Sequence, residues 1–180
     1  LDLGLGGQEQ GELLGGAASW ALVANLPYNV AVPIIMSVLE RAPMVRRLVV
    51  MVQKEVAERL VASPGGRTVG IPSMRVAWYA EAELLGTVPP EVFVPRPRVT
   101  SALVGMTRRE PPTGALGPDE VFPLVATAYR QRRKMLRSTL GSVVPPGAFE
   151  RAGIAPTSRP EELAVGQWAD LALAARALRA

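Results

Sequence analysis

The run from Trp20 to Asn29, which reads WALVANLPYN, constrains the fold more than any other stretch of this sequence. It is an apolar segment of strand length that stops abruptly at an amide, a proline and an aromatic residue, a pattern that predicts a buried strand ending in a functional site. In an open α/β sheet, ligands bind outside the carboxyl ends of the strands. We therefore expect this strand to present Asn25 and Tyr28 to a ligand.

The side chains at this strand end suit one kind of target. Asn25 offers an oxygen acceptor, Tyr28 offers a flat face with a polar tip, and Pro27 fixes the backbone so that the carbonyls around it are held ready to accept hydrogen bonds. Two convergent acceptors beside a stacking ring fit an exocyclic amino group on a flat base. Holding both N–H groups would draw the nitrogen lone pair out of conjugation and direct it at an electrophile.

The next part of the chain predicts an α/β domain. A helical pattern from Val30 to Glu40, an apolar run from Leu48 to Val52 and a second helix from Glu55 to Ala62 follow the first strand. This order of strand, helix, strand and helix is typical of a doubly wound parallel sheet. The pattern from Ile71 to Tyr79 fits either a helix or a strand, and a strand is expected from Ala82 to Val88.

A proline-rich segment and a change of composition follow. Pro95 and Pro97 forbid a helix, so the segment that begins at Val92 is expected to be an extended loop that leads into a strand. We place the boundaries at 1–110 for the α/β part, 111–118 for a Pro/Gly linker and 119–180 for a small helical domain. In that domain the pattern predicts helices over 119–140, 148–152 and 161–178.

Composition excludes several classes of chemistry. The chain has no cysteine and no histidine, which excludes disulfides, a Ser-His-Asp triad and metal sites built on those ligands, so we expect no metal. No apolar run is long enough to span a bilayer and no signal-peptide pattern is present, so we expect a cytoplasmic monomer without membrane contact. The glycine-rich stretch from Asp2 to Gly7 imitates a cofactor loop, but too few residues separate it from Trp20 for the βα units that should intervene.

Charge is distributed unevenly along the chain. The first 107 residues carry equal numbers of basic and acidic side chains, so the whole net charge of +4 lies in residues 108–180. The densest basic cluster is Arg130-Gln131-Arg132-Arg133-Lys134-Met135-Leu136-Arg137. On the expected helix, most of these cations would share one face, where they would repel one another unless phosphates faced them. The cluster predicts an RNA-binding surface, and a merely solvated helix face is the alternative.

Several motifs together resemble one family. Asn25-Leu26-Pro27-Tyr28 resembles the catalytic tetrapeptide of S-adenosylmethionine-dependent adenine-N6 methyltransferases, in particular the ribosomal RNA adenine dimethyltransferases of the KsgA type. Phe93-Val94-Pro95-Arg96-Pro97-Arg98-Val99, followed by Ser101, is similar to the family's second aromatic motif. The stretch from Met51 to Leu60 and the basic cluster also resemble family sequences, and the motifs occur in the expected order. Ala31-Val32 and Val69-Gly70 depart from the family's usual residues.

The resemblance implies a fold, a reaction and a set of site residues. It implies the C-terminal half of a doubly wound Rossmann-like methyltransferase sheet plus a small all-helical C-terminal domain. It also implies dimethylation, by S-adenosylmethionine, of N6 of two adjacent adenosines in the 3′-terminal hairpin of small-subunit ribosomal RNA during ribosome biogenesis. The implied catalytic residues are Asn25, Leu26, Pro27, Tyr28 and Phe93, with Asn25 and Pro27 also contacting the cofactor; the implied RNA-binding residues are Arg96, Arg98, Arg130, Arg132, Arg133, Lys134 and Arg137.

Other interpretations remain open. The family's first strands carry the glycine-rich loop and the acidic residues that hold the cofactor, and this chain begins after them, so we expect it to be truncated at its N-terminus and to hold half of the cofactor site. An Erm-type methyltransferase acting on large-subunit RNA shares the tetrapeptide, although the basic cluster counts against it. A non-catalytic RNA-binding or ribosome-assembly fragment is the third possibility.

Overall fold

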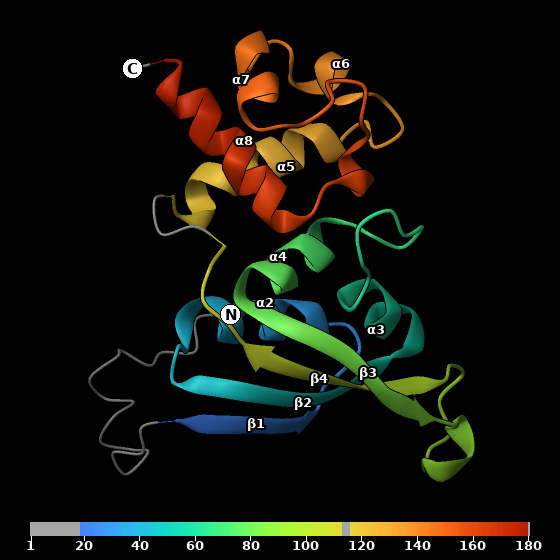
Figure 1. Cartoon of the computed structure of the whole chain (residues 1–180). Helices are drawn as coiled ribbons and strands as arrows, with labels where there is room; N and C mark the ends of the chain where they lie inside the picture. Colours follow the sequence, from blue (N-terminus) through green and yellow to red (C-terminus); the bar gives the residue numbers. More distant parts are fainter. Residues whose placement is uncertain (1–18, 113–115, 180) are drawn as a thin grey trace.

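The computed structural model of the chain describes residues 19–112 and 116–179. The expectations for residues 1–18, including the glycine-rich stretch, and for residues 113–115 of the linker lie outside these ranges. In the described part, a four-stranded sheet with helices packed on one face forms an α/β layer, and a group of helices from the C-terminal third sits over those helices (Figure 1). The predicted α/β class is confirmed.

The sheet is mixed rather than wholly parallel. Strands β1 (Trp20–Asn25), β2 (Val45–Gln53), β3 (Ala80–Val88) and β4 (Ser101–Arg108) are arranged in the order β1-β2-β4-β3. β1 and β2 are parallel, as the strand-helix-strand pattern predicts, whereas β4 runs antiparallel to both β2 and β3. β3 and β4 are joined by a proline-rich loop instead of a crossover helix, so they pair as antiparallel neighbours.

Three helices cover one face of the sheet. α2 (Ala31–Arg41) presents Ile35 and Leu39 to the sheet, which are almost fully buried, and α3 (Lys54–Leu60) follows β2 directly. In β2, every second residue is buried from Leu48 onward, and Leu48, Val50 and Val52 pack against these helices. The described residues contribute helices to this face alone, and the doubly wound arrangement stays a proposal.

The undecided stretch forms helix α4 (Ile71–Tyr79). Its start explains why: Pro72 is in the first turn, where a missing N–H costs nothing, and the Ser73 Oγ accepts from the Gly70 N–H at 3.1 Å while donating to the Arg59 carbonyl at 2.6 Å. Met74 and Trp78 on one side of α4 belong to the core of the C-terminal helices. α4 therefore packs against both parts of the protein.

The C-terminal group contains α5 (Pro118–Tyr129), α6 (Leu136–Leu140), α7 (Pro146–Arg151) and α8 (Val165–Ala177), with a short 3-10 helix at Pro160–Glu162. Another 3-10 helix, Pro90–Val92, lies in the loop between β3 and β4. The helix expected over 148–152 is present with shifted ends, and the one expected over 161–178 is shorter because the 3-10 turn precedes it. No helix in the two described ranges is long and apolar enough to cross a membrane.

The single helix expected over 119–140 is wrong. α5 ends at Tyr129, a turn follows, and α6 starts at Leu136. The Leu136 and Arg137 N–H groups donate to the Ser158 and Pro156 carbonyls at 2.8 and 2.9 Å, so a distant segment replaces the helical acceptors of the preceding turn. Crowding of like charges in the basic cluster also disfavours a continuous helix there.

Candidate active site

The tetrapeptide lies at the carboxyl end of β1, where the chain leaves the sheet. Asn25 is the last residue of the strand and its side chain is exposed, whereas Leu26 is buried. The Leu26 N–H extends the ladder by donating to the Met51 carbonyl at 3.2 Å. The buried Leu26 anchors the turn, so the Asn25 amide is held at the strand end.

The two backbone acceptors that the sequence offered are not equivalent. The Pro27 carbonyl accepts from the Val30 N–H at 3.1 Å in the turn that begins α2. The Leu26 carbonyl has no hydrogen-bond partner within the described part of the chain. The geometry therefore favours Leu26 over Pro27 as the second acceptor beside Asn25.

The proline-rich loop after β3 completes a cavity of about 300 Å³ at this strand end. Phe93 comes to the tetrapeptide although more than 60 residues separate them in the sequence, as the motif pairing predicted. The lining is made by Asn25, Leu26, Pro27, Tyr28, Phe93, Pro95 and Pro97. A lining that combines amide and carbonyl acceptors with aromatic and proline rings suits a flat, amino-bearing ring.

A hydrogen bond between side chains fixes the Tyr28 ring. The Tyr28 hydroxyl and the Ser101 Oγ are 2.7 Å apart, and Ser101 is fully buried at the start of β4. Because β4 lies between β2 and β3, the ring orientation is tied to the centre of the sheet. Sequence analysis singled out Ser101 only as part of a resemblance, and this contact gives it a physical role.

Comparisons with known proteins identify the family. A family model described as "Ribosomal RNA adenine dimethylase" matches residues 16–176. The chain belongs to this family. A relative from Kineococcus radiotolerans, named ribosomal RNA small subunit methyltransferase A, is 52% identical over 164 residues, covering 88% of this chain and 55% of its own length. A protein of the same name from Cutibacterium acnes is 48% identical over 177 residues, covering 93% and 58%.

Two solved structures share the fold. A dimethyladenosine transferase from Plasmodium falciparum superposes with a TM-score of 0.74 at 21% identity, covering 84% of this chain and 64% of that one. The 23S ribosomal RNA methyltransferase ErmE superposes with a TM-score of 0.63, also at 21% identity, covering 88% of this chain and 66% of that one.

The chain spans about half the length of the curated relatives it matches.

The predicted RNA-binding arginines of the aromatic loop alternate with Pro95 and Pro97, which line the cavity. Arg96 and Arg98 are both exposed, and Arg96 forms an ion pair with Glu91 of the same loop. Arg98 has no ion-pair partner among the described residues. Arg98 is therefore the freer of the two for a contact outside the protein.

The basic cluster does not form the expected helix face. Arg130, Arg133 and Lys134 are exposed in the turn between α5 and α6, and Arg137 is exposed on α6. Arg132 differs from them because its guanidinium is engaged within the protein. The cations are presented by a turn, which sequence periodicity alone did not predict.

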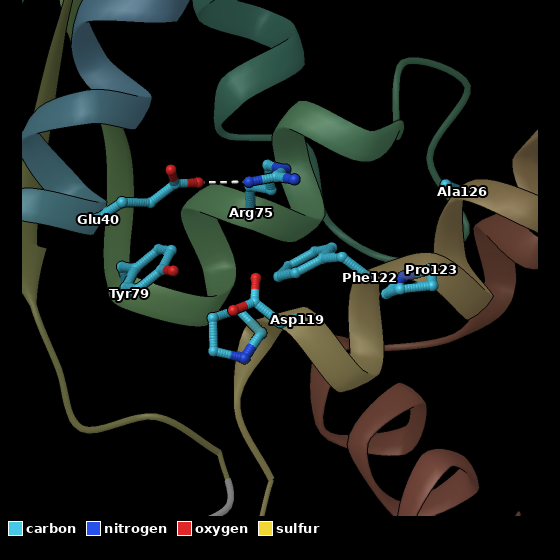
Figure 2. Close-up of a pocket in the computed structure, with 8 residues that line it drawn as sticks. Glu40, Arg75, Tyr79, Asp119, Phe122, Pro123 and Ala126 are labelled. Carbon is cyan, nitrogen blue, oxygen red and sulfur yellow. Dashed lines mark hydrogen bonds and ion pairs between the residues drawn. The ribbon is translucent and has the colours of Figure 1, made fainter. Parts of the chain in front are cut away.

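A second and larger cavity, of about 500 Å³, lies between α4 and α5 (Figure 2). The Arg75 guanidinium pairs with Glu40 and lies 4.8 Å from the centroid of the Phe122 ring. Burial raises the pKa of the Tyr79 hydroxyl, and the nearby Glu40 carboxylate adds to the rise. None of the predicted catalytic residues lines this cavity, so we place the chemistry at the smaller one.

The sequence did not point to the second cavity, because Glu40 and Arg75 belong to no motif and are 35 residues apart in the chain. Within residues 19–112 and 116–179, no group of three or more His, Cys, Asp or Glu side chains is arranged to hold a metal ion. The site that this family member offers is made of amide, carbonyl and aromatic groups.

Proposed function

We propose that this chain forms the base-holding part of a ribosomal RNA adenine dimethyltransferase that methylates N6 of two adjacent adenosines in the 3′-terminal hairpin of small-subunit ribosomal RNA. The observation that carries the proposal is the cavity whose lining brings Asn25 and Leu26 together with Tyr28 and Phe93. The small-subunit target is supported by the names of the relatives from Kineococcus and Cutibacterium.

Each residue of the cavity has a distinct task in this proposal. The Asn25 side-chain oxygen and the Leu26 carbonyl accept the two hydrogens of the adenine amino group, which orients the nitrogen lone pair. Tyr28 and Phe93 stack on the base after it leaves its helix. No side chain need act as a nucleophile, because the adenine amino nitrogen itself attacks the methyl group.

The residues at the end of β1 fit one part of a methyl donor, its methionine end. S-adenosylmethionine, when bound, supplies an electrophilic methyl group. Asn25 and Pro27 would contact its methionine end, since both are exposed at the carboxyl end of β1. We propose that the remaining contacts belong to a larger, doubly wound sheet of which β1 to β4 form the C-terminal half.

The second part of the proposal assigns RNA binding to the C-terminal helical domain, residues 119–180, joined by the linker 111–118. The exposed cations of the turn after α5 supply phosphate contacts, and Arg98 extends them beside the cavity. The protein is proposed to act as a cytoplasmic monomer.

Two alternatives remain. The ErmE superposition supports the same fold for a large-subunit methyltransferase, and the two would be separated by which ribosomal subunit accepts the methyl group. The span of about half the relatives' length favours a non-catalytic RNA-binding or ribosome-assembly role for the 180 residues alone.

The test is transfer of a labelled methyl group from S-adenosylmethionine to undermethylated small ribosomal subunits, with nuclease digestion to identify N6-dimethyladenosine. It is run on the 180-residue chain and on a longer protein that contains it. Dimethyladenosine formed by the longer protein supports the proposal, and formation by the 180 residues alone would show that they hold a complete site. Failure of both, with the subunit still bound, favours the RNA-binding alternative.

Asn25→Ala is expected to reduce transfer by about 100-fold or more, since an acceptor for the reacting nitrogen is lost. RNA binding should stay nearly unchanged, because Asn25 is remote in sequence from the basic turn. Asn29→Ala is the matched control: Asn29 is an exposed amide of the same turn that does not line the cavity. An Asn25→Ala protein that transfers methyl groups as well as Asn29→Ala would refute the assignment.

A further inference from the structure

The loop of residues 61–70, between α3 and α4, is docked on the C-terminal helical group (Figure 1). The Gly65 N–H donates to the Glu161 carbonyl at 2.7 Å. Val69, at the end of the loop, is almost fully buried in the core of the helical group. A segment of the α/β part is thereby fixed to the domain that carries the basic turn.

Arg132 makes the strongest connection between this loop and the turn. Its Nη2 donates to the Arg67 carbonyl at 2.8 Å and to the Gly66 carbonyl at 3.4 Å, while its Nε lies 3.7 Å from the Glu161 Oε2. The Glu161 side chain is only 18% exposed and its Oε2 has no hydrogen-bond partner, so the carboxylate depends on the guanidinium for compensation. Arg132 is thus committed to contacts inside the protein.

Arg67 of the loop has an exposed side chain although its backbone is held by Arg132. This side chain has no ion-pair partner among the described residues. Arg133 and Lys134, which follow Arg132 directly, are exposed as well. Fixing the loop to Arg132 brings the Arg67 backbone to the turn that carries Arg133 and Lys134, so exposed cations of both parts of the protein lie on neighbouring segments.

We propose that Arg132 is a positioning residue that acts through the loop of residues 61–70, and that Arg67 of this loop is a contact for the RNA phosphate backbone beside Arg133 and Lys134. The inference rests on the proposed function. It assigns Arg132 to loop geometry rather than to direct phosphate binding, and it adds a residue from outside the helical domain to the RNA-binding surface.

The first test is a double-mutant cycle on binding of the chain to isolated small ribosomal subunits, measured over about 50 to 200 mM salt. Arg67→Ala should lower the log–log salt slope by about 0.9, the value for one lost phosphate contact. In the Arg132→Ala background the same change should have little further effect, because the loop is no longer held. Strictly additive effects would overturn the proposal.

The second test asks whether removal of a negative charge strengthens or weakens RNA binding. Glu161→Ala removes a negative charge, which would strengthen RNA binding if overall charge alone mattered. We expect weaker binding, by about threefold or more, because Arg132 loses its carboxylate partner and the loop loosens. The matched control is Glu150→Ala, which removes an exposed carboxylate of α7 whose side chain has no partner among the described residues, and which should leave binding equal or stronger. Stronger binding by both variants would contradict the inference.

Arg132→Lys separates positioning from direct contact. A lysine keeps the charge and could still meet a phosphate, but it lacks the planar fork that joins the two carbonyls to Glu161. We expect it to behave like Arg132→Ala in affinity and to show faster amide hydrogen exchange at Gly65, whose N–H is bonded to Glu161. Binding equal to that of the unaltered chain would make Arg132 a phosphate contact and overturn its positioning role.

Failure of the inference is distinguishable from failure of the proposed function. If Arg133→Ala with Lys134→Ala flattens the salt dependence while the Arg67 and Glu161 variants do not weaken binding, only the inference is wrong. If no variant of the turn or loop differs from Arg46→Ala, an exposed cation at the start of β2, or if the chain does not bind the subunit, the RNA-binding surface itself is wrong and the inference with it.

Discussion

At the residue scale, the Tyr28 hydroxyl has one hydrogen-bond partner among the described residues. This hydroxyl and the buried Ser101 Oγ share one hydrogen bond of 2.7 Å. A neutral hydrogen bond contributes about 1 kcal/mol, so Tyr28→Phe and Ser101→Ala should each lower methyl transfer about fivefold. Because both remove the same bond, the double variant should be no worse than either one, whereas Tyr28→Ala also loses stacking and should be much worse. Single-turnover methyl transfer measures these effects. If the effects of Tyr28→Phe and Ser101→Ala multiply in the double variant, loss of their common hydrogen bond is not the cause of both.

Sequence reasoning was effective for residues whose chemistry is in their own side chain. Asn25, Tyr28 and Phe93 carry groups that suit an adenine wherever they lie, and the structure brings them to one cavity. It did not find the intramolecular contacts of Arg132, which was grouped with its neighbours by charge. The partners of Arg132 are two backbone carbonyls and a carboxylate distant in sequence, and backbone acceptors leave no mark in a residue pattern.

At the element scale, the end of α2 is capped by a side chain from the sheet. Arg108 of β4 donates to the carbonyls of Val38, Leu39, Ala42 and Val45, at 2.9 to 3.2 Å. Burial lowers its pKa, and the nearby Arg46 cation lowers it further. The last carbonyls of a helix lack partners within it, and the guanidinium supplies one to the Leu39 carbonyl. It also adds a second donor to the Val38 and Ala42 carbonyls, which already accept backbone N–H groups, and it ties this helix end to β2 through Val45.

Arg108→Met should therefore lower the free energy of unfolding by about 2 to 4 kcal/mol, since charged hydrogen bonds are lost and buried acceptors remain. Urea unfolding measures the change, and hydrogen exchange should be fastest in the last turn of α2. Arg109→Met is the control, because it makes the same charge change at the next residue, whose Nε has no hydrogen-bond partner. Equal destabilisation by the two variants would contradict the capping role.

Elements were predicted well where burial imposes a period. α2 and β2 each bury one side, and their patterns gave the correct types. The helix expected over 119–140 failed because Leu136 and Arg137 bond to residues 156 and 158, an arrangement that only the folded chain creates. The stretch from Ile71 to Tyr79 was undecidable by period because α4 packs on both the sheet layer and the C-terminal helices, so apolar residues occur on more than one side.

At the scale of the whole molecule, the two parts meet at α4. Val76 belongs to the core under the sheet, while Met74 and Trp78 belong to the core of the C-terminal helices. The Trp78 and Phe122 rings meet edge to face at a centroid distance of 5.7 Å. The α/β class could be predicted from strand and helix order, but this shared helix could not, since no local pattern tells which of two cores a side chain enters.

Arg75 of α4 contacts both α2 and α5, and its loss should weaken the attachment of α5. Its guanidinium pairs with Glu40 of α2 and lies over the Phe122 ring of α5 (Figure 2). An exposed ion pair and an exposed cation–π contact each contribute about 0.5 to 1 kcal/mol, so Arg75→Ala should lower the free energy of unfolding by about 1 kcal/mol. Glu40→Gln keeps the ring contact and should cost less, while Arg59→Ala, an exposed cation on α3, should cost little. Urea unfolding and hydrogen exchange in α5 measure the effect. An Arg75→Ala chain that is as stable and as protected in α5 as Arg59→Ala would show that Arg75 does not contribute to the attachment of α5 and that the buried contacts of α4 are sufficient.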